Sequence, residues 1–294
     1  METYISSFAF FMLCDKRADI LLPDNEGINP AWFQNIRPND ILHVQPFQLK
    51  NFITIMLHIP CEFRVLTNFG DATLPEINMN DCALLLEYPL LTHWYVQNWN
   101  WVPHPKITQI PIGMDYLSSH PGNIGPSAGF GPTMSMLEQD AQLRSLTSVC
   151  SPSIPLTQRI PKLFCNFQYR MNSGHGYFER PFALTIPSHL RFMAPKLPRL
   201  DTWRLMSQYA FVLCPPGNGL DTHRTWEALV LGCIPVVKTS GLDTLYANLP
   251  VLIVKKWGDV TESLLTDTLR EYSTKTFNYE KLTLQHWEGI LSRV

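Results

Sequence analysis

The sequence predicts an α/β fold with two domains, each built around a parallel sheet. Short apolar runs, several of them β-branched, alternate with helical stretches, and this alternation is typical of parallel sheets with crossover helices. The chain has 294 residues, enough for two domains that each bury a core. Two turn-rich segments divide it: residues 118–133 hold four glycines and three prolines, and residues 148–161 hold three prolines.

The first half of the chain is expected to form the first sheet. Strands are predicted at residues 40–44, 63–67 and 107–112, with a weaker strand at 84–87, and helices at residues 47–58 and 134–147. Ligands usually meet parallel sheets at the carboxyl ends of their strands. Asp71 and Asp115 each follow a predicted strand, so both are expected at the functional edge.

The second half resumes the alternation after a domain boundary that we place near Pro155. Strands are predicted at residues 163–167, 189–193, 209–213, 234–237 and 251–254, and helices at residues 202–208, 259–272 and 282–291. No internal repeat is visible.

The most informative segment is residues 209–237, YAFVLCPPGNGLDTHRTWEALVLGCIPVV. A buried strand is followed by a loop with two prolines and two glycines, and then by a helix that Asp221 or Thr222 can cap and that ends at Gly232. Such a unit aims free backbone N–H groups and the positive end of a helix dipole at one place. The segment therefore predicts an anion site.

Arg224 is unusual because a cation in the first turn of a helix faces the positive end of the dipole, at a cost of about a few tenths of a kcal/mol. The position is explained if Arg224 and the helix end share an anion such as a diphosphate. Glu227 lies three residues on, so an Arg–Glu pair on a solvated face is the alternative. The glycine loop before the pair and the apolar helix around it favour the anion.

The segment NGLDTHRTWEALVLGCIPVVK resembles the C-terminal signature of exostosin-like glycosyltransferases, glycosyltransferase family 47. It is most similar to short soluble forms from giant DNA viruses and some protists. Three further segments resemble that family: LTNFGDATLPE (66–76), residues 93–116, and KLFCNFQYRMN (162–172) with Arg180 downstream.

The resemblance implies a GT-B fold, in which two Rossmann-like domains with parallel sheets face each other across a cleft. It places an acceptor-side domain at residues 1–155, a domain that binds a nucleotide sugar at 156–275, and a last helix at 276–294 that packs back on the first domain. It also implies sugar transfer with inversion, from a donor expected to be a UDP-sugar to a glycan or glycoconjugate acceptor.

Donor binding is expected at the helix that carries Arg224. The arginine and the loop backbone are predicted to hold the diphosphate, Glu227 takes the ribose by resemblance, and His223 contacts the donor. Arg170 and Arg180 are further candidates, with surface arginines as the equal alternative. The predicted donor-binding residues are Gly217, Asn218, Gly219, His223, Arg224, Glu227, Arg170 and Arg180.

The resemblance implies that the catalytic base comes from the first domain. Asp71 is our first candidate, since its turn follows a strand; Asp115 and Asp15 come next. The alternative for Asp71 is a turn residue or helix cap. Trp99 and Trp101 are candidates for stacking against acceptor sugars, with core filling as the alternative.

No metal or other cofactor is expected. The sequence has no D-x-D, no H-E-x-x-H and no Cys/His cluster with metal spacing, so arginines and the helix dipole are expected to stabilise the leaving diphosphate. The same loop lacks the Lys-Ser/Thr pair of a P-loop hydrolase. The alternative function is a GT-B-fold protein that binds a sugar or nucleotide without turnover.

Composition limits the partners. A net charge of −2 argues against nucleic-acid binding. Seven cysteines without C-x-x-C spacing are typical of reduced core thiols. There is no basic leader before the first apolar run and no run near the roughly 18 apolar residues of a membrane span, so we expect a cytoplasmic location.

Overall fold

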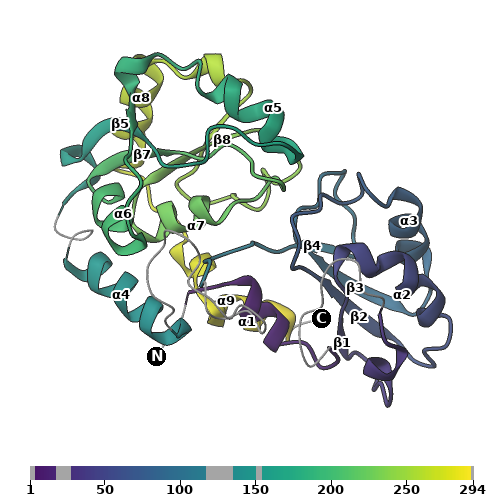
Figure 1. The fold of residues 1–294 in the computed structure, drawn as a ribbon. Helices are drawn as coiled ribbons and strands as arrows, with labels where there is room; N and C mark the ends of the chain where they lie inside the picture. Colours follow the sequence, from purple (N-terminus) through teal and green to yellow (C-terminus); the bar gives the residue numbers. More distant parts are fainter. Residues whose placement is uncertain (1–3, 18–27, 117–134, 150–153, 293–294) are drawn as a thin grey trace.

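Two parallel sheets organise the molecule, as the computed structural model shows (Figure 1). The structure describes residues 4–17, 28–116, 135–149 and 154–292. The first sheet has the order β1-β2-β3-β4 and the second β6-β5-β7-β8-β9, with every neighbouring pair parallel. The predicted fold class, α/β with two parallel sheets, is confirmed.

The strands of the first sheet are β1 (Ile41–His43), β2 (Phe63–Thr67), β3 (Leu91–Val96) and β4 (Ile107–Gln109). Those of the second are β5 (Ile160–Cys165), β6 (Arg191–Met193), β7 (Tyr209–Leu213), β8 (Ile234–Lys238) and β9 (Leu252–Val254). All residues of β2 and β7 are buried, as the continuous apolar character of parallel strands predicts.

The helices are α1 (Ser7–Met12), α2 (Leu49–Met56), α3 (Met79–Glu87), α4 (Met136–Val149), α5 (Gly174–Ala183), α6 (Arg199–Met206), α7 (His223–Val230), α8 (Glu262–Tyr272) and α9 (Leu284–Leu291). Short 3-10 helices lie at Pro30–Phe33, Pro46–Gln48, Leu156–Gln158, Ser188–Leu190, Trp257–Asp259 and Tyr279–Leu282. None of the described helices is both long and apolar enough to span a bilayer.

The predicted weak strand at residues 84–87 is wrong. These residues form the end of α3, which buries Cys82 and Leu85 on one face. A run of four apolar residues is too short to separate a helix from a strand by periodicity. The strand that follows α3 and pairs with β2 is β3, which starts at Leu91 and carries the aromatic residues Trp94 and Tyr95; the other neighbour of β2 is β1.

A hydrophobic core runs between the two sheets. It joins Leu66 and Tyr95 of the first sheet to Phe164 and Val212 of the second, and α1 and α9 both contribute to it. Figure 1 shows α1 and α9 side by side, beneath the second sheet and beside the first. The boundaries at residues 155 and 275 stay a prediction, since this core belongs to both halves.

Helix α9 contacts the first part of the chain directly. The rings of Phe10 in α1 and Trp287 in α9 meet edge to face with centroids 5.7 Å apart. The guanidinium of Arg64 donates a hydrogen bond to the main-chain oxygen of Leu291. The first and last described helices therefore close the space between the sheets together.

Candidate functional site

The strand order of the second sheet locates a candidate ligand site. The chain leaves β5 for β6 on one side and returns to β7 on the other. In open parallel sheets, ligands bind where the order reverses, outside the carboxyl ends of the two strands. This switch point lies between the residues that follow β5 and the loop at residues 214–222 that follows β7.

The glycine loop leads into α7. Thr222 is the N-cap residue, and its main-chain oxygen accepts a hydrogen bond of 3.0 Å from the N–H of Thr225. The N–H groups of His223 and Arg224 form no hydrogen bond with other described residues. The helix ends before Gly232, whose φ of +71° is the left-handed conformation that glycine favours. The first turn of α7 thus presents free donors at the switch point.

Two arginines flank one aromatic ring at this place. The guanidinium carbons of Arg180 and Arg224 lie 5.6 and 5.5 Å from the ring centroid of Phe167. Arg224 is held by a hydrogen bond of 2.7 Å from Nε to Asn166 Oδ1. Arg180 donates from Nε to the main-chain oxygen of Pro216, at 2.9 Å. Both loops at the switch point therefore fix a guanidinium.

The positive charge of this pair is only partly balanced within the part of the chain that the structure describes, where the nearby Glu227 carboxylate favours the charged form of Arg224. Neither Arg180 nor Arg224 forms an ion pair with a carboxylate there. Burial lowers the pKa of both groups, and the charge of Arg224 adds to this at Arg180, whose pKa falls to about 10. A bound anion would remove this cost, because charge-assisted hydrogen bonds replace lost hydration.

Arg199 of α6 links two of the predicted acidic residues. Its Nη2 lies 3.1 Å from Asp115 Oδ2 and 4.0 Å from Glu227 Oε1. Asp115 therefore has a cation partner already, and Glu227 is buried, with 8% of its surface exposed. Sequence reasoning missed Arg199, since it starts an ordinary-looking helix and carries no motif.

The glycines of the loop have different surroundings. A Cβ at Gly219 would lie 2.6 Å from both the main-chain oxygen of Asp71 and Asn98 Nδ2, so this glycine permits close contact with the first sheet. A Cβ at Gly217 would meet Arg180 Nη2 at 3.5 Å, an ordinary contact. Asn218 between them donates to Asp71 Oδ2 at 3.1 Å. The predicted donor loop and the predicted base are thus neighbours.

Asp221 fastens this loop to the rest of the molecule. Its buried carboxylate accepts hydrogen bonds from the N–H of Ile112 at 2.9 Å, from Trp226 Nε1 at 2.9 and 3.0 Å, and from the hydroxyl of Tyr246 at 3.2 Å. Burial raises its pKa above the usual range. Asp221 does not cap α7, and no local pattern could show partners that come from three separate segments.

A small cavity lies where the first turn of α7 faces the first sheet. Its volume is about 130 Å³, and Asp71 and His223 both line it, with Ser6, Ser7 and Gln97. His223 Nδ1 lies 2.8 Å from the main-chain oxygen of Gly113. Of the three predicted base candidates, Asp71 alone lines this cavity.

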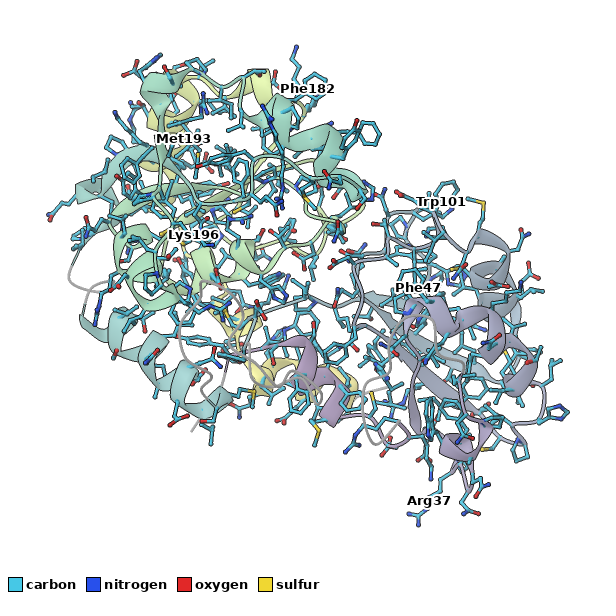
Figure 2. All side chains as sticks on the ribbon, viewed as in Figure 1. Arg37, Phe47, Trp101, Phe182, Met193 and Lys196 are labelled. Carbon is cyan, nitrogen blue, oxygen red and sulfur yellow. The ribbon has the colours of Figure 1, made fainter. Side chains whose placement is uncertain are left out.

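Trp99 and Trp101, the predicted acceptor residues, line a different cavity of about 570 Å³, to which residues of α9 also contribute. Trp99 is 2% exposed and packs against Trp94, with ring centroids 5.6 Å apart, so its ring mainly fills the core. Trp101 is 54% exposed, and Figure 2 shows it on the edge of the first sheet's domain that faces the second. Neither tryptophan lies in the cavity that holds Asp71.

The remaining predictions concern Arg170 and the metal. Arg170 is exposed and has no hydrogen bond or ion pair with another described residue. Asp15, a lesser base candidate, accepts a hydrogen bond of 2.8 Å from the N–H of Ile41. In the described ranges, no three His, Cys, Asp or Glu side chains are grouped so that they could hold a metal ion.

Comparisons with known proteins end at the level of fold. No protein-family model matches the sequence, and no curated protein does, so the exostosin-like assignment stays a prediction. One similar solved structure is a UDP-forming α,α-trehalose-phosphate synthase from Burkholderia xenovorans, with 12% identity, a TM-score of 0.38, and coverage of 87% of this chain and 70% of that chain. The corresponding UDP-forming synthase from Burkholderia vietnamiensis has 11% identity, a TM-score of 0.37, and coverage of 87% and 68%. Both likenesses are too distant to carry an argument about activity.

Proposed function

We propose that the protein is an inverting glycosyltransferase that moves a sugar from a nucleotide-sugar donor, a UDP-sugar, to a hydroxyl group of a glycan or glycoconjugate. The observation that supports this best is the pair Arg180 and Arg224. Two partly desolvated cations, neither of which forms an ion pair with a carboxylate of the described residues, flank Phe167 at the switch point of a parallel sheet. A diphosphate has the charge and the size to lie against both.

The proposed reaction needs negative charge to be stabilised on the leaving diphosphate as the bond to the sugar breaks. The guanidinium groups and the free N–H groups of the first turn of α7 supply fixed donors for this charge. Because these donors belong to the chain, we propose that transfer requires no metal. Glu227, three residues after Arg224, is the proposed acceptor for ribose hydroxyls.

The acceptor is proposed to bind on the side of the first sheet. Its reacting hydroxyl would enter the cavity that Asp71 and His223 line. Asp71 remains a better candidate base than Asp115, because Asp71 lines this cavity whereas the Asp115 carboxylate is engaged in an ion pair with Arg199 and does not line it. Trp101, in the other cavity, would contact only a part of the acceptor remote from the reacting hydroxyl.

A binding experiment with arginine variants tests the donor site. The full chain is titrated calorimetrically with UDP and with a panel of UDP-sugars. We expect Arg224→Ala and Arg180→Ala each to weaken binding by about 10- to 100-fold, as the loss of a hydrogen bond to a charged group predicts. Arg204→Ala is the matched control, since Arg204 is an exposed arginine paired with Asp201 at 3.2 Å.

Each outcome of this titration decides something. If the intact protein binds no nucleotide or nucleotide sugar, the proposed function is wrong. If it binds a nucleotide sugar but neither hydrolyses it nor transfers its sugar to any glycan, the protein is a binding protein without turnover. If EDTA abolishes the activity and Mn²⁺ or Mg²⁺ then restores it, transfer requires a metal and that part of the proposal is wrong.

A further inference from the structure

His223 has a geometry that the donor-binding role does not explain. It is the first residue of α7, and its side chain lines the cavity of about 130 Å³ together with Asp71. Arg224, the next residue, is directed instead to Asn166 at the end of β5. Consecutive residues of one helical turn thus face the two places where donor and acceptor are proposed to bind.

The hydrogen bond to Gly113 fixes the tautomer of this histidine. Nδ1 lies 2.8 Å from the main-chain oxygen of Gly113. A carbonyl oxygen can only accept, so Nδ1 must carry the proton, and in the neutral ring the free electron pair is on Nε2. Nε2 makes no hydrogen bond with other described residues. His223 is therefore arranged as an unoccupied proton acceptor.

The Gly113 peptide, which orients the ring, is itself held by close packing and a hydrogen bond. Gly113 has a φ of +67°, and a Cβ there would lie 2.3 Å from the main-chain oxygen of Ile5. Met114 donates a hydrogen bond of 2.8 Å to the same oxygen. The segment before α1 thus clamps the Gly113 peptide, and the peptide holds the imidazole. A base must be held in this way to act efficiently, because proton transfer needs a fixed geometry.

Asp71 is less suited to the same task. Its side chain is exposed, and Oδ2 already accepts a hydrogen bond of 3.1 Å from Asn218. His223 Nε2, by contrast, makes no hydrogen bond with another described residue, so the imidazole has an open acceptor nitrogen where the Asp71 carboxylate is already partly engaged.

We propose that His223, through Nε2, is the group that removes the proton from the acceptor hydroxyl. This deepens the proposed function and rests on it. The hydroxyl oxygen forms a bond to the anomeric carbon as the bond from that carbon to the diphosphate oxygen breaks. The electron pair leaves with the diphosphate, and the proton passes to Nε2. The resulting imidazolium keeps its Nδ1–H bond to Gly113.

The decisive variant is His223→Asn. Its amide nitrogen can replace Nδ1–H as the donor to Gly113, but it has no basic nitrogen in place of Nε2. We expect unchanged thermal unfolding and donor affinity within about twofold, while kcat for transfer falls by about 10²- to 10⁴-fold. His223→Ala removes both the base and the hydrogen bond, and Asp71→Asn is measured beside them.

The pH dependence gives a second readout. In the wild type, we expect kcat to fall toward acidic pH, where protonation of the acceptor nitrogen removes the base, and we expect this acidic limb to be absent from the residual activity of His223→Asn. A second measurement does not depend on activity. The ¹⁵N NMR spectrum, recorded at a pH at which the His223 ring is neutral, should show the proton on Nδ1. The opposite tautomer would overturn the assignment.

The outcomes separate this inference from the function on which it rests. If His223→Asn retains at least about a tenth of the wild-type kcat, or if Asp71→Asn alone abolishes transfer, His223 is not the proton acceptor. The proposed donor site at Arg180 and Arg224 would not be affected by that result. If the wild type neither transfers nor hydrolyses any nucleotide sugar, the proposed function fails and takes this inference with it.

Discussion

At the scale of single residues, the burial of polar groups makes the stability of the fold depend on pH. His43, at the carboxyl end of β1, is such a group. It is 4% exposed, its Nε2 lies 2.9 Å from Asn68 Oδ1, and its ring packs on Phe11 with centroids 4.9 Å apart. Burial lowers its pKa from 6.5 to about 4.

This histidine should make stability depend on pH. Between the unfolded pKa of 6.5 and the folded pKa of about 4, the unfolded chain binds the proton and the folded chain does not, so the free energy of unfolding falls as the pH drops. The contribution of the neutral His43 to the free energy of unfolding is present in full above pH 6.5. Over the whole window the loss is about 3 kcal/mol.

His43→Gln tests this prediction, because glutamine can keep the hydrogen bond to Asn68 without titrating. Urea unfolding of wild type and variant is followed from pH 7.5 to pH 4.5. The wild type should lose more stability over this range than the variant. Parallel pH profiles would show that His43 is not the group responsible.

At the scale of elements, the unit from β7 through α7 to β8 was the part most open to prediction. Its apolar runs, proline–glycine loop and terminal Gly232 each have a local physical meaning, and strands predicted at residues 63–67, 209–213 and 234–237 are confirmed. Helix α5 was not predicted, because it contains Gly174, Gly176 and Pro181, and glycine and proline are typical of loops. A Cβ at Gly176 would lie 2.8 Å from the main-chain oxygen of Pro216, so packing and not propensity explains that glycine.

The two loop glycines should respond differently to alanine. At Gly219 the new methyl group collides with the peptide of Asp71, and we expect Gly219→Ala to lower the free energy of unfolding by about 1 to 3 kcal/mol. Gly217→Ala is the matched control, because its nearest neighbour, Arg180 Nη2, lies 3.5 Å away. Thermal or urea unfolding compares them; an equal loss in both would contradict the assignment of Gly219 to the contact between the sheets.

At the scale of the whole molecule, the two halves are joined by contacts that no local pattern could reveal. The bonds from Asp221 to Ile112 and from His223 to Gly113 link residues 109 and 110 positions apart. Arg180, Arg224 and the loop glycines could be named as candidates from the sequence, since their types carry the chemistry, whereas Arg199 could not. Which of them meet, and that Trp101 and Asp71 line separate cavities, depends on how two sheets face each other.

Asp221→Asn tests how much of the stability resides in this junction. An asparagine of the same size would turn an N–H₂ group toward Ile112, Trp226 or Tyr246, all of which donate to the carboxylate. We expect the free energy of unfolding to fall by about 2 to 4 kcal/mol. Tyr246→Phe, which removes one weak donor at 3.2 Å, should cost less. If the midpoint of urea unfolding is the same in Asp221→Asn and the wild type, the junction contributes little.

The pairing of α1 with α9 has a consequence for the order of events during synthesis. Phe10 is synthesised long before Trp287, its ring partner in α9. The first sheet can therefore form while translation continues, whereas the core between the sheets must wait for residues 284–291. Until then Phe10 of α1 lacks the aromatic partner that α9 supplies in the folded protein.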